Sequence, residues 1–174
     1  MEVLVVGHGP SYRNFEFIRE FDGLILSVDF SGKDLVEHGI IPDYILFSEI
    51  NEGVIDYIDH SLPQIYKGLD ITFIHKAQLT KPVIKIMDDM GLRHETFFPA
   101  YNGKAADDNV GLYSIAYAHM VLKADEIHLI GLDYKGTDHL GHDHSDAWIR
   151  QAKSFVDFCK PKIIDHSGGN FPKS

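Results

Sequence analysis

Several features that would place a protein quickly in a functional class are scarce in this sequence. It has a single cysteine, Cys159, which excludes an internal disulfide framework and a zinc site built from cysteines. Its apolar runs are far shorter than the roughly 18 to 20 residues that a membrane span needs. Only 16 Lys and Arg stand against 26 Asp and Glu, and a formal net charge of −10 argues against binding to a nucleic-acid backbone. We expect no nucleic-acid partner, no membrane span and, by default, a cytoplasmic location.

The composition that is present is that of an ordinary globular domain. The chain has 174 residues, of which 44% are hydrophobic and 24% charged, so it can bury one core of useful size. No repeat, linker or low-complexity stretch divides it. We therefore expect a single domain over residues 1–174.

Strand-like and helix-like segments alternate along the chain. Short segments rich in β-branched residues predict strands at 2–7, 23–29, 43–49, 70–75, 126–133 and 161–166. Helical spacing of apolar residues predicts helices at 11–21, 32–39, 51–68, 81–91, 110–124 and 145–160. This alternation predicts an α/β fold, a single Rossmann-like doubly wound domain with a mostly parallel sheet. In such sheets ligands bind outside the carboxyl ends of the strands, near the point where strand order reverses.

The first strand leads into the turn of "VLVVGHGPSY", residues 3–12. Gly7 and Gly9 allow the backbone to approach a ligand closely, Pro10 suits a first helical turn, and the amide of Ser11 begins a helix. A nucleotide phosphate could bind there. The turn lacks the third glycine of a dinucleotide fingerprint and the Lys-Ser/Thr pair of a P-loop, so an ordinary strand-to-helix turn capped by Ser11 is the alternative.

Polar residues also follow the second and third predicted strands. Asp29 ends "SVD", and Ser48 and Glu49 end "ILFSE". Acidic groups at such positions accept ribose hydroxyls or hold Mg²⁺, whereas a helix N-cap or a solvated charge is the alternative for each.

A second group of candidates lies around the strand predicted at 126–133. Asp108 or Asn109 is expected to cap the preceding helix, whose first turn can approach a ligand closely at Gly111. Asp133 and Lys135 follow the strand, and Lys135 is either a phosphate-binding cation or an ordinary solvated one.

Three histidines alternate with acidic residues in "GTDHLGHDHSDAW", residues 136–148. Imidazole titrates near neutral pH, so His139 or His142 is expected to act as a general base. A transition-metal site that includes His144 and a merely solvated loop are the alternatives, and we assign no metal to the chain.

Taken in order, several blocks resemble a known group of enzymes. They are "VLVVGHGPSY", "SVDFSGKDLVEHGIIPDYILFSEIN", "DNVGLYSIAYAHMVLKADEIHLIGLDYKG", the histidine-bearing stretch and "IIDHSGGNF". They resemble the 6-hydroxymethylpterin diphosphokinase-like domain of archaeal enzymes and of bacterial flagellin-glycosylating motility accessory factors. They are also similar to bacterial α-2,3/2,8-sialyltransferases, in which a Gly-Asn-Gly-Pro-Ser turn opens a Rossmann-like nucleotide-sugar fold. The most specific feature is G-x-G-P-S combined with a late V-G-(x)n-G-x-D block.

The resemblance implies a nucleotide-dependent transferase. On its sialyltransferase-like side it implies a glycosyltransferase with a CMP-type nucleotide-sugar donor, whose phosphate site is lined by Gly7, Gly9 and Ser11. Asp29 and Ser48 would contact base or ribose, where those enzymes have asparagines. A catalytic histidine would lie in the histidine-bearing stretch.

Two alternatives stay open beside this reading. The diphosphokinase-like side of the resemblance implies ATP with Mg²⁺ held by Asp29, Glu49 and Asp133, although "FSEIN" keeps only Glu49 of the acidic pattern. A non-catalytic nucleotide-binding protein of the same fold is the third reading. Each reading gives a small-molecule nucleotide as partner, the enzymes add an acceptor, and a homo-oligomer is left open.

Overall fold

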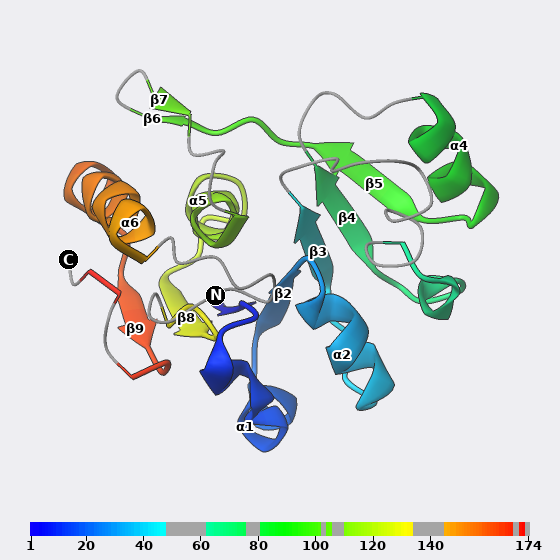
Figure 1. Ribbon diagram of the computed structural model, residues 1–174, viewed down its shortest axis with the longest axis horizontal. Helices are drawn as coiled ribbons and strands as arrows, with labels where there is room; N and C mark the ends of the chain where they lie inside the picture. The colour runs from blue at the N-terminus through cyan, green and yellow to red at the C-terminus, as the bar shows by residue number, and fades with distance from the viewer. Residues whose placement is uncertain are drawn as a thin grey trace.

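The computed structural model of the protein describes residues 1–47, 62–75, 81–101, 104–105, 110–133, 145–168 and 171–172. Its centre is a seven-stranded sheet in the order β5-β4-β3-β2-β1-β8-β9 (Figure 1). Every neighbouring pair in this sheet is parallel. The strands are β1 (Glu2–Val6), β2 (Leu24–Val28), β3 (Tyr44–Phe47), β4 (Thr72–His75), β5 (Arg93–Thr96), β8 (Glu126–Ile130) and β9 (Ile163–Asp165). A separate antiparallel hairpin pairs β6 (Ala100–Tyr101) with β7 (Lys104–Ala105).

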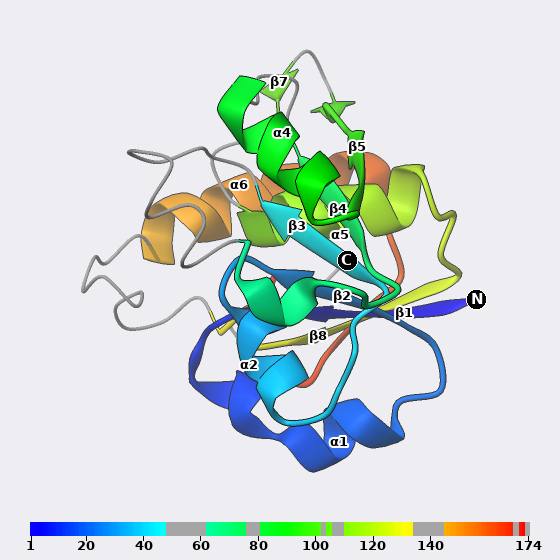
Figure 2. The same cartoon turned by 90° about the vertical axis from the view of Figure 1, so that its right-hand side faces the viewer.

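Helices cover both faces of the sheet (Figures 1 and 2). They are α1 (Phe15–Glu20), α2 (Ser31–Glu37), α4 (Lys81–Asp89), α5 (Val110–Met120) and α6 (Ser145–Cys159), with short 3-10 helices η1 (Pro10–Arg13) and η2 (Gln64–Tyr66). The predicted Rossmann-like α/β fold with a parallel sheet is therefore confirmed. Among the described residues, no helix combines the length and the apolar character needed to cross a membrane.

The central strands are apolar on both sides because both of their faces are covered. On one face Val3, Val5 and Leu26 pack with residues of α5 and α6. On the other face, Leu4 and Val6 pack with residues of α1 and α2. Eight consecutive residues of α5, 111–118, are buried, which fits a helix enclosed between the sheet and its neighbours.

The structure differs from the sequence expectation in four places, one of which is the hairpin of β6 and β7, which was not predicted. Strand β5 was not predicted because its sequence, Arg-His-Glu-Thr, is polar and mostly exposed at the edge of the sheet. The helix expected at 11–21 is divided into η1 and α1 at Asn14, whose side chain accepts a hydrogen bond from the Phe17 amide. In the described part of the helix expected at 51–68, only the 3-10 turn Gln64–Tyr66 is helical, after Pro63 in an extended conformation.

Strand order reverses between β1 and β8. From β1 the chain adds β2, β3, β4 and β5 on one side, and later returns to place β8 and β9 on the other. At this reversal the backbones of the two strand exits touch: the Gly7 amide donates to the Ile130 carbonyl at 2.8 Å, and the Gly9 amide donates to the Gly131 carbonyl at 2.7 Å. Gly131 has φ +72, and a Cβ there would lie 2.6 Å from the Gly7 carbonyl oxygen. This approach requires glycine.

The close approach predicts a large stability difference between two glycine substitutions. Gly91 also has a positive φ, +68, but nothing lies within 4 Å of the position that a Cβ atom would take there. We expect Gly91→Ala to lower the free energy of unfolding by about 1 to 2 kcal/mol, the cost of the left-handed conformation alone. Gly131→Ala adds a clash with backbone and should cost about 1 to 3 kcal/mol more. Urea denaturation measures both, and equal losses would contradict the close-contact argument.

Candidate functional site

The candidate site lies at the carboxyl ends of β1, β2 and β8, beside the reversal of strand order. Parallel strands expose their last residues and the following turns at a common edge of the sheet. Where strand order reverses, the chain segments that follow the two adjacent strands turn away from each other, which leaves room for a ligand between them. Three segments meet at this edge: the turn 7–13 after β1, the turn 29–34 after β2, and residues 131–133 after β8. The helix α5 runs back toward the start of β8, so its first turn, with the buried Gly111, lies at the same edge.

The turn after β1 is joined to the exit of β8 by Ser11 and Asp133. The Asp133 carboxylate accepts hydrogen bonds from the Ser11 amide at 3.2 Å and from the Ser11 hydroxyl at 3.0 Å. The same hydroxyl accepts a hydrogen bond from the Gly131 amide at 2.8 Å. Asp133 is only 4% exposed, so its charge depends on these donors for compensation.

This arrangement changes what the predicted phosphate-binding residues can do. The amides of Gly7 and Gly9 already donate to carbonyl groups of β8 and its exit, and the Ser11 amide donates to Asp133. A carboxylate thus occupies the start of η1, the position at which an anionic ligand was expected. A phosphate at this turn has to displace the Asp133 side chain or bind through other groups. The phosphate role of these residues stays a prediction.

Asp29 stands at the exit of β2 in an uncommon backbone conformation. Its φ is 45, a left-handed value that Asp tolerates better than most residues. Its amide donates to the Leu46 carbonyl at 3.0 Å, which ties the turn to β3. The buried Ser31 hydroxyl lies 2.8 Å from the carbonyl oxygens of Val6 and Val28 and so links the ends of β1 and β2. Strained residues held by such contacts are typical of ligand sites.

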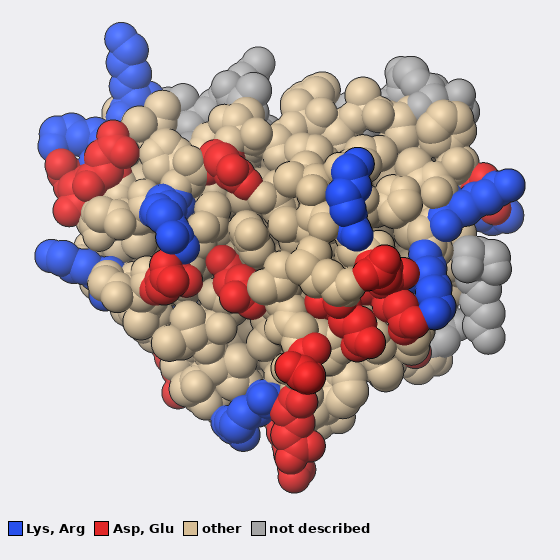
Figure 3. Space-filling view, turned by 180° about the vertical axis from the view of Figure 1, so that it is seen from behind, with Lys and Arg blue, Asp and Glu red and all other residues tan. Residues whose placement is uncertain are grey.

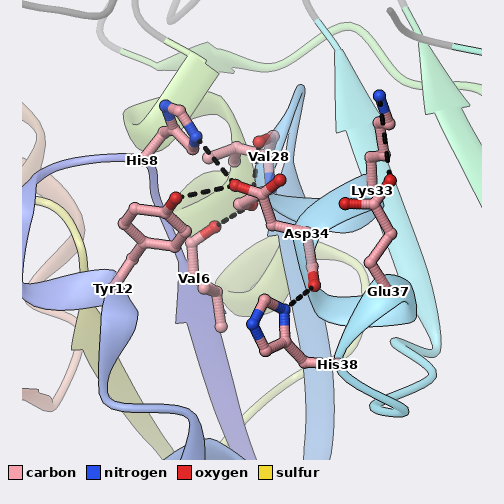
Figure 4. Close-up of polar contacts among 9 residues, drawn as sticks. Val6, His8, Tyr12, Val28, Lys33, Asp34, Glu37 and His38 are labelled. Atoms are coloured by element: carbon pink, nitrogen blue, oxygen red, sulfur yellow. Dashed lines mark hydrogen bonds and ion pairs between the residues drawn. The ribbon is translucent and has the colours of Figure 1, made fainter.

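A histidine, a tyrosine and an aspartate meet in front of these strand ends (Figure 4). The Asp34 carboxylate, on α2, lies 2.7 Å from the Tyr12 hydroxyl and 3.2 Å from His8 Nε2. The His8 and Tyr12 rings pack together with centroids 4.6 Å apart. Burial, and next the hydrogen bond to Asp34, raise the pKa of Tyr12, so this hydroxyl stays protonated and donates to the carboxylate.

The pair formed by His8 and Asp34 has the geometry of an oriented imidazole. A carboxylate bound to one ring nitrogen selects the tautomer and stabilises the imidazolium if the ring takes up a proton. Both side chains are partly accessible, with 28% and 30% of their surface exposed. The arrangement can therefore move a proton or bind a polar ligand. Its residues come from two separate segments, η1 with its preceding turn and α2.

Among the residues predicted from the sequence, the structure brings Gly7, Gly9, Ser11 and Asp133 into contact and places Asp29 on the neighbouring strand exit. Other predicted residues lie outside the described part of the chain: Ser48, Glu49, Asn109, Lys135, His139 and His142.

Sequence reasoning missed His8, Tyr12 and Asp34 as functional residues. His8 and Tyr12 stand inside the turn that was singled out, but its glycines and its serine gave the stronger signal. Asp34 is the fourth residue of α2 and resembles any acidic residue in the first turn of a helix. Only its contact with the first turn of the chain, 22 and 26 residues away, marks it as part of a site.

Comparisons with known proteins agree with this fold. No family model and no curated protein matches the sequence. Among solved structures, the Maf glycosyltransferase of Magnetospirillum magneticum is similar with a TM-score of 0.57 and 20% identity, over 80% of this chain and 24% of its own. The thiamine pyrophosphokinase of Bacillus subtilis has 14% identity and a TM-score of 0.49, and covers 97% of this chain and 61% of its own. The thiamin pyrophosphokinase of Geobacillus thermodenitrificans has 20% identity and a TM-score of 0.48, over 95% of this chain and 59% of its own.

The chain thus spans about a quarter of the glycosyltransferase and about six tenths of each pyrophosphokinase. At these identities the likeness concerns the fold. The resemblance to the motility accessory factor domain is confirmed at that level. The relation to sialyltransferases stays a prediction.

The contact between Ser11 and Asp133 predicts a measurable coupling in stability. Ser11→Ala and Asp133→Asn should each lower the free energy of unfolding by about 1 to 3 kcal/mol, because each leaves buried polar groups without their partners. The double variant should lose less than the sum, with a coupling of roughly 1 kcal/mol or more. Chemical denaturation of the four proteins measures it. Asp157→Asn, which removes the exposed pair with Lys153 on α6, is the control and should change stability by less than about 0.5 kcal/mol. Strictly additive losses would contradict the coupling.

Proposed function

We propose that the protein is a nucleotide-dependent transferase whose ligand binds over the carboxyl ends of β1, β2 and β8. The observation that carries the proposal is the gathering of Asp29, the Asp34 cluster and Asp133 at the reversal of strand order, where ligands of open parallel sheets bind. The fold shared with part of the Maf glycosyltransferase is consistent with this assignment.

Within this class, we favour a sialyltransferase-like glycosyltransferase that uses a CMP-type nucleotide-sugar donor. Carboxylates at strand exits accept ribose hydroxyls, and Asp29 is our candidate for this contact. The transfer needs a base that removes a proton from the acceptor hydroxyl while the nucleotide leaves as a phosphate. His139 or His142 is assigned as this base, and Lys135 would neutralise the leaving phosphate.

An ATP-dependent, diphosphokinase-like activity is the second candidate, and one observation favours it. The described polar side chains at this edge include three carboxylates, those of Asp29, Asp34 and Asp133. Carboxylate oxygens are ligands that suit Mg²⁺ bound to a nucleotide.

Calorimetry separates the two candidates. The first predicts that CMP binds in the presence of a chelator, whereas the second predicts that ATP binds only with Mg²⁺. Asp29→Asn should weaken whichever nucleotide binds by roughly tenfold, the effect of about 1.4 kcal/mol. Asp157→Asn, on the distant exposed pair of α6, should leave affinity unchanged. Absence of binding by both nucleotides would refute the proposed function, and binding without turnover of any donor would favour a non-catalytic nucleotide-binding protein.

The assignment of the general base is tested by three histidine substitutions. If His139 or His142 is the base, alanine at that position should lower turnover by roughly 10²-fold or more while donor affinity stays nearly constant. His144→Ala, in the same stretch, should retain turnover within about threefold, because no proton transfer is assigned to it. Full activity of both the His139→Ala and His142→Ala variants would show that the base lies elsewhere, with His8 as the next candidate because Asp34 orients it.

A further inference from the structure

A second cluster of ligand-type side chains lies at the opposite edge of the sheet, where the strands begin. Glu2 starts β1 and pairs directly with Glu126, which starts β8, and His128 follows two residues later on the same face of the sheet. One oxygen or nitrogen atom from each of these three side chains lies within 4.8 Å of the others. His128 Nε2 is 3.5 Å from the Glu2 carboxylate and 3.8 Å from the Glu126 carboxylate.

These separations are too long for hydrogen bonds and suit ligands of one ion. A charge-assisted hydrogen bond between nitrogen and a carboxylate oxygen is about 2.7 to 2.9 Å long. Atoms that share a tetrahedral metal ion at bond lengths of about 2.0 to 2.1 Å are roughly 3.3 to 3.4 Å apart. His128 Nε2 is fully buried, and among the described residues no hydrogen bond satisfies it. The side chain is 12% exposed, so leaving this nitrogen without a partner is costly.

The imidazole of His128 is held by a second histidine. His128 Nδ1 lies 2.9 Å from His166 Nε2, and the two rings are nearly parallel. At this distance one of the two facing nitrogens donates a hydrogen to the other, and His166 Nε2 is placed to accept it from His128 Nδ1. With the shared hydrogen on Nδ1, the Nε2 atom that lies between the Glu2 and Glu126 carboxylates is available to bind a metal ion. Metal-binding histidines are oriented in the same way by an acceptor on their other nitrogen.

The surroundings keep this geometry. The Phe21 ring packs edge-on against His128 with centroids 5.0 Å apart, and Phe17 packs against His166 at 4.6 Å. Lys162 pairs with the other oxygen of Glu126 and leaves the oxygen that faces His128 available. Figure 3, which views the molecule from the side where the strands begin, shows several separate groups of acidic side chains with basic side chains beside them.

We propose that Glu2, Glu126 and His128 bind a divalent transition metal of the zinc type, with His166 orienting the histidine ligand. One nitrogen and two carboxylate oxygens are a donor set that zinc accepts, and a fourth position remains for water. The ion joins the starts of β1 and β8, the two neighbouring strands between which strand order reverses, and so stabilises the fold. The site lies at the edge opposite the proposed nucleotide site and does not depend on that function.

Zinc titration of the full, untagged chain tests the proposal. The test uses a parent protein in which His139, His142 and His144 are replaced by alanine, because that histidine-rich stretch offers zinc ligands of its own. We expect one zinc ion per chain by calorimetry and a higher melting temperature with zinc. His128→Gln and Glu2→Gln should each weaken binding by at least about tenfold, and His166→Phe, which keeps the ring but removes its nitrogen, by roughly 10- to 100-fold.

Asp125→Asn is the matched control. It removes an acidic charge from the same region, where Asp125 pairs with the N-terminal ammonium group, without removing a proposed ligand. Zinc affinity should stay within about twofold of the parent, because the ion is held by direct bonds to its ligands and only weakly by the electrostatic attraction of nearby charges, which salt screens. The proposal is overturned if the parent binds no zinc, if Glu2→Gln and Asp125→Asn weaken binding equally, or if Glu2→Gln and His128→Gln retain full affinity. In those cases the imidazole and the carboxylates form an ordinary ion pair. Because Glu2 is exposed, Glu2→Gln remains informative even if His128→Gln does not fold.

Discussion

The contact between the exits of β1 and β8 is the constraint on which the rest of the structure depends. A Cβ atom on Gly7 would lie 2.3 Å from the Gly131 carbonyl oxygen, so the two backbones can approach this closely only with glycine at both positions. Two backbone hydrogen bonds then extend the register of the strand pair beyond its ends. Because the close approach leaves Asp133 beside the start of η1, the same contact also determines the electrostatics of the candidate site.

A carboxylate at the start of a helix has chemical consequences for a nucleotide-binding edge. In many α/β proteins the first turn offers free amides to a phosphate, but here the Ser11 amide already donates to Asp133. Among the described residues of this edge, His8 and Asp34 are partly accessible, and with the buried Tyr12 they can orient a proton or bind hydroxyl groups. A bare anion at this turn therefore meets the Asp133 carboxylate in place of a free Ser11 amide.

The fold could be predicted from the sequence because the same physical rule acts on every central strand. A strand covered by helices on both faces is mainly apolar, and the segments that became β1, β2 and β3 show this plainly, whereas β8 carries Glu126 and His128 beside its apolar residues. The edge strand β5 escaped the same reasoning because exposure removes the apolar signal. Its pairing with β4 is decided by backbone hydrogen bonds, which any sequence of suitable length can form.

The candidate site was predictable only in part. Local chemistry marked Gly7, Gly9, Ser11, Asp29 and Asp133, since glycines and polar residues directly after apolar strands indicate the ligand edge of a parallel sheet. Only the tertiary structure shows which of these groups already form hydrogen bonds with each other. It alone also shows that Asp34 contacts His8 and Tyr12. The same is true of Glu2, Glu126 and His128. Sequence by itself determined the alternation of elements and the edge at which polar groups collect, because these follow from short-range patterning. The partners of each charged side chain depend on which strands become neighbours in the sheet. Strand neighbours such as β1 and β8 bring together residues more than 100 positions apart, which local sequence patterns do not indicate.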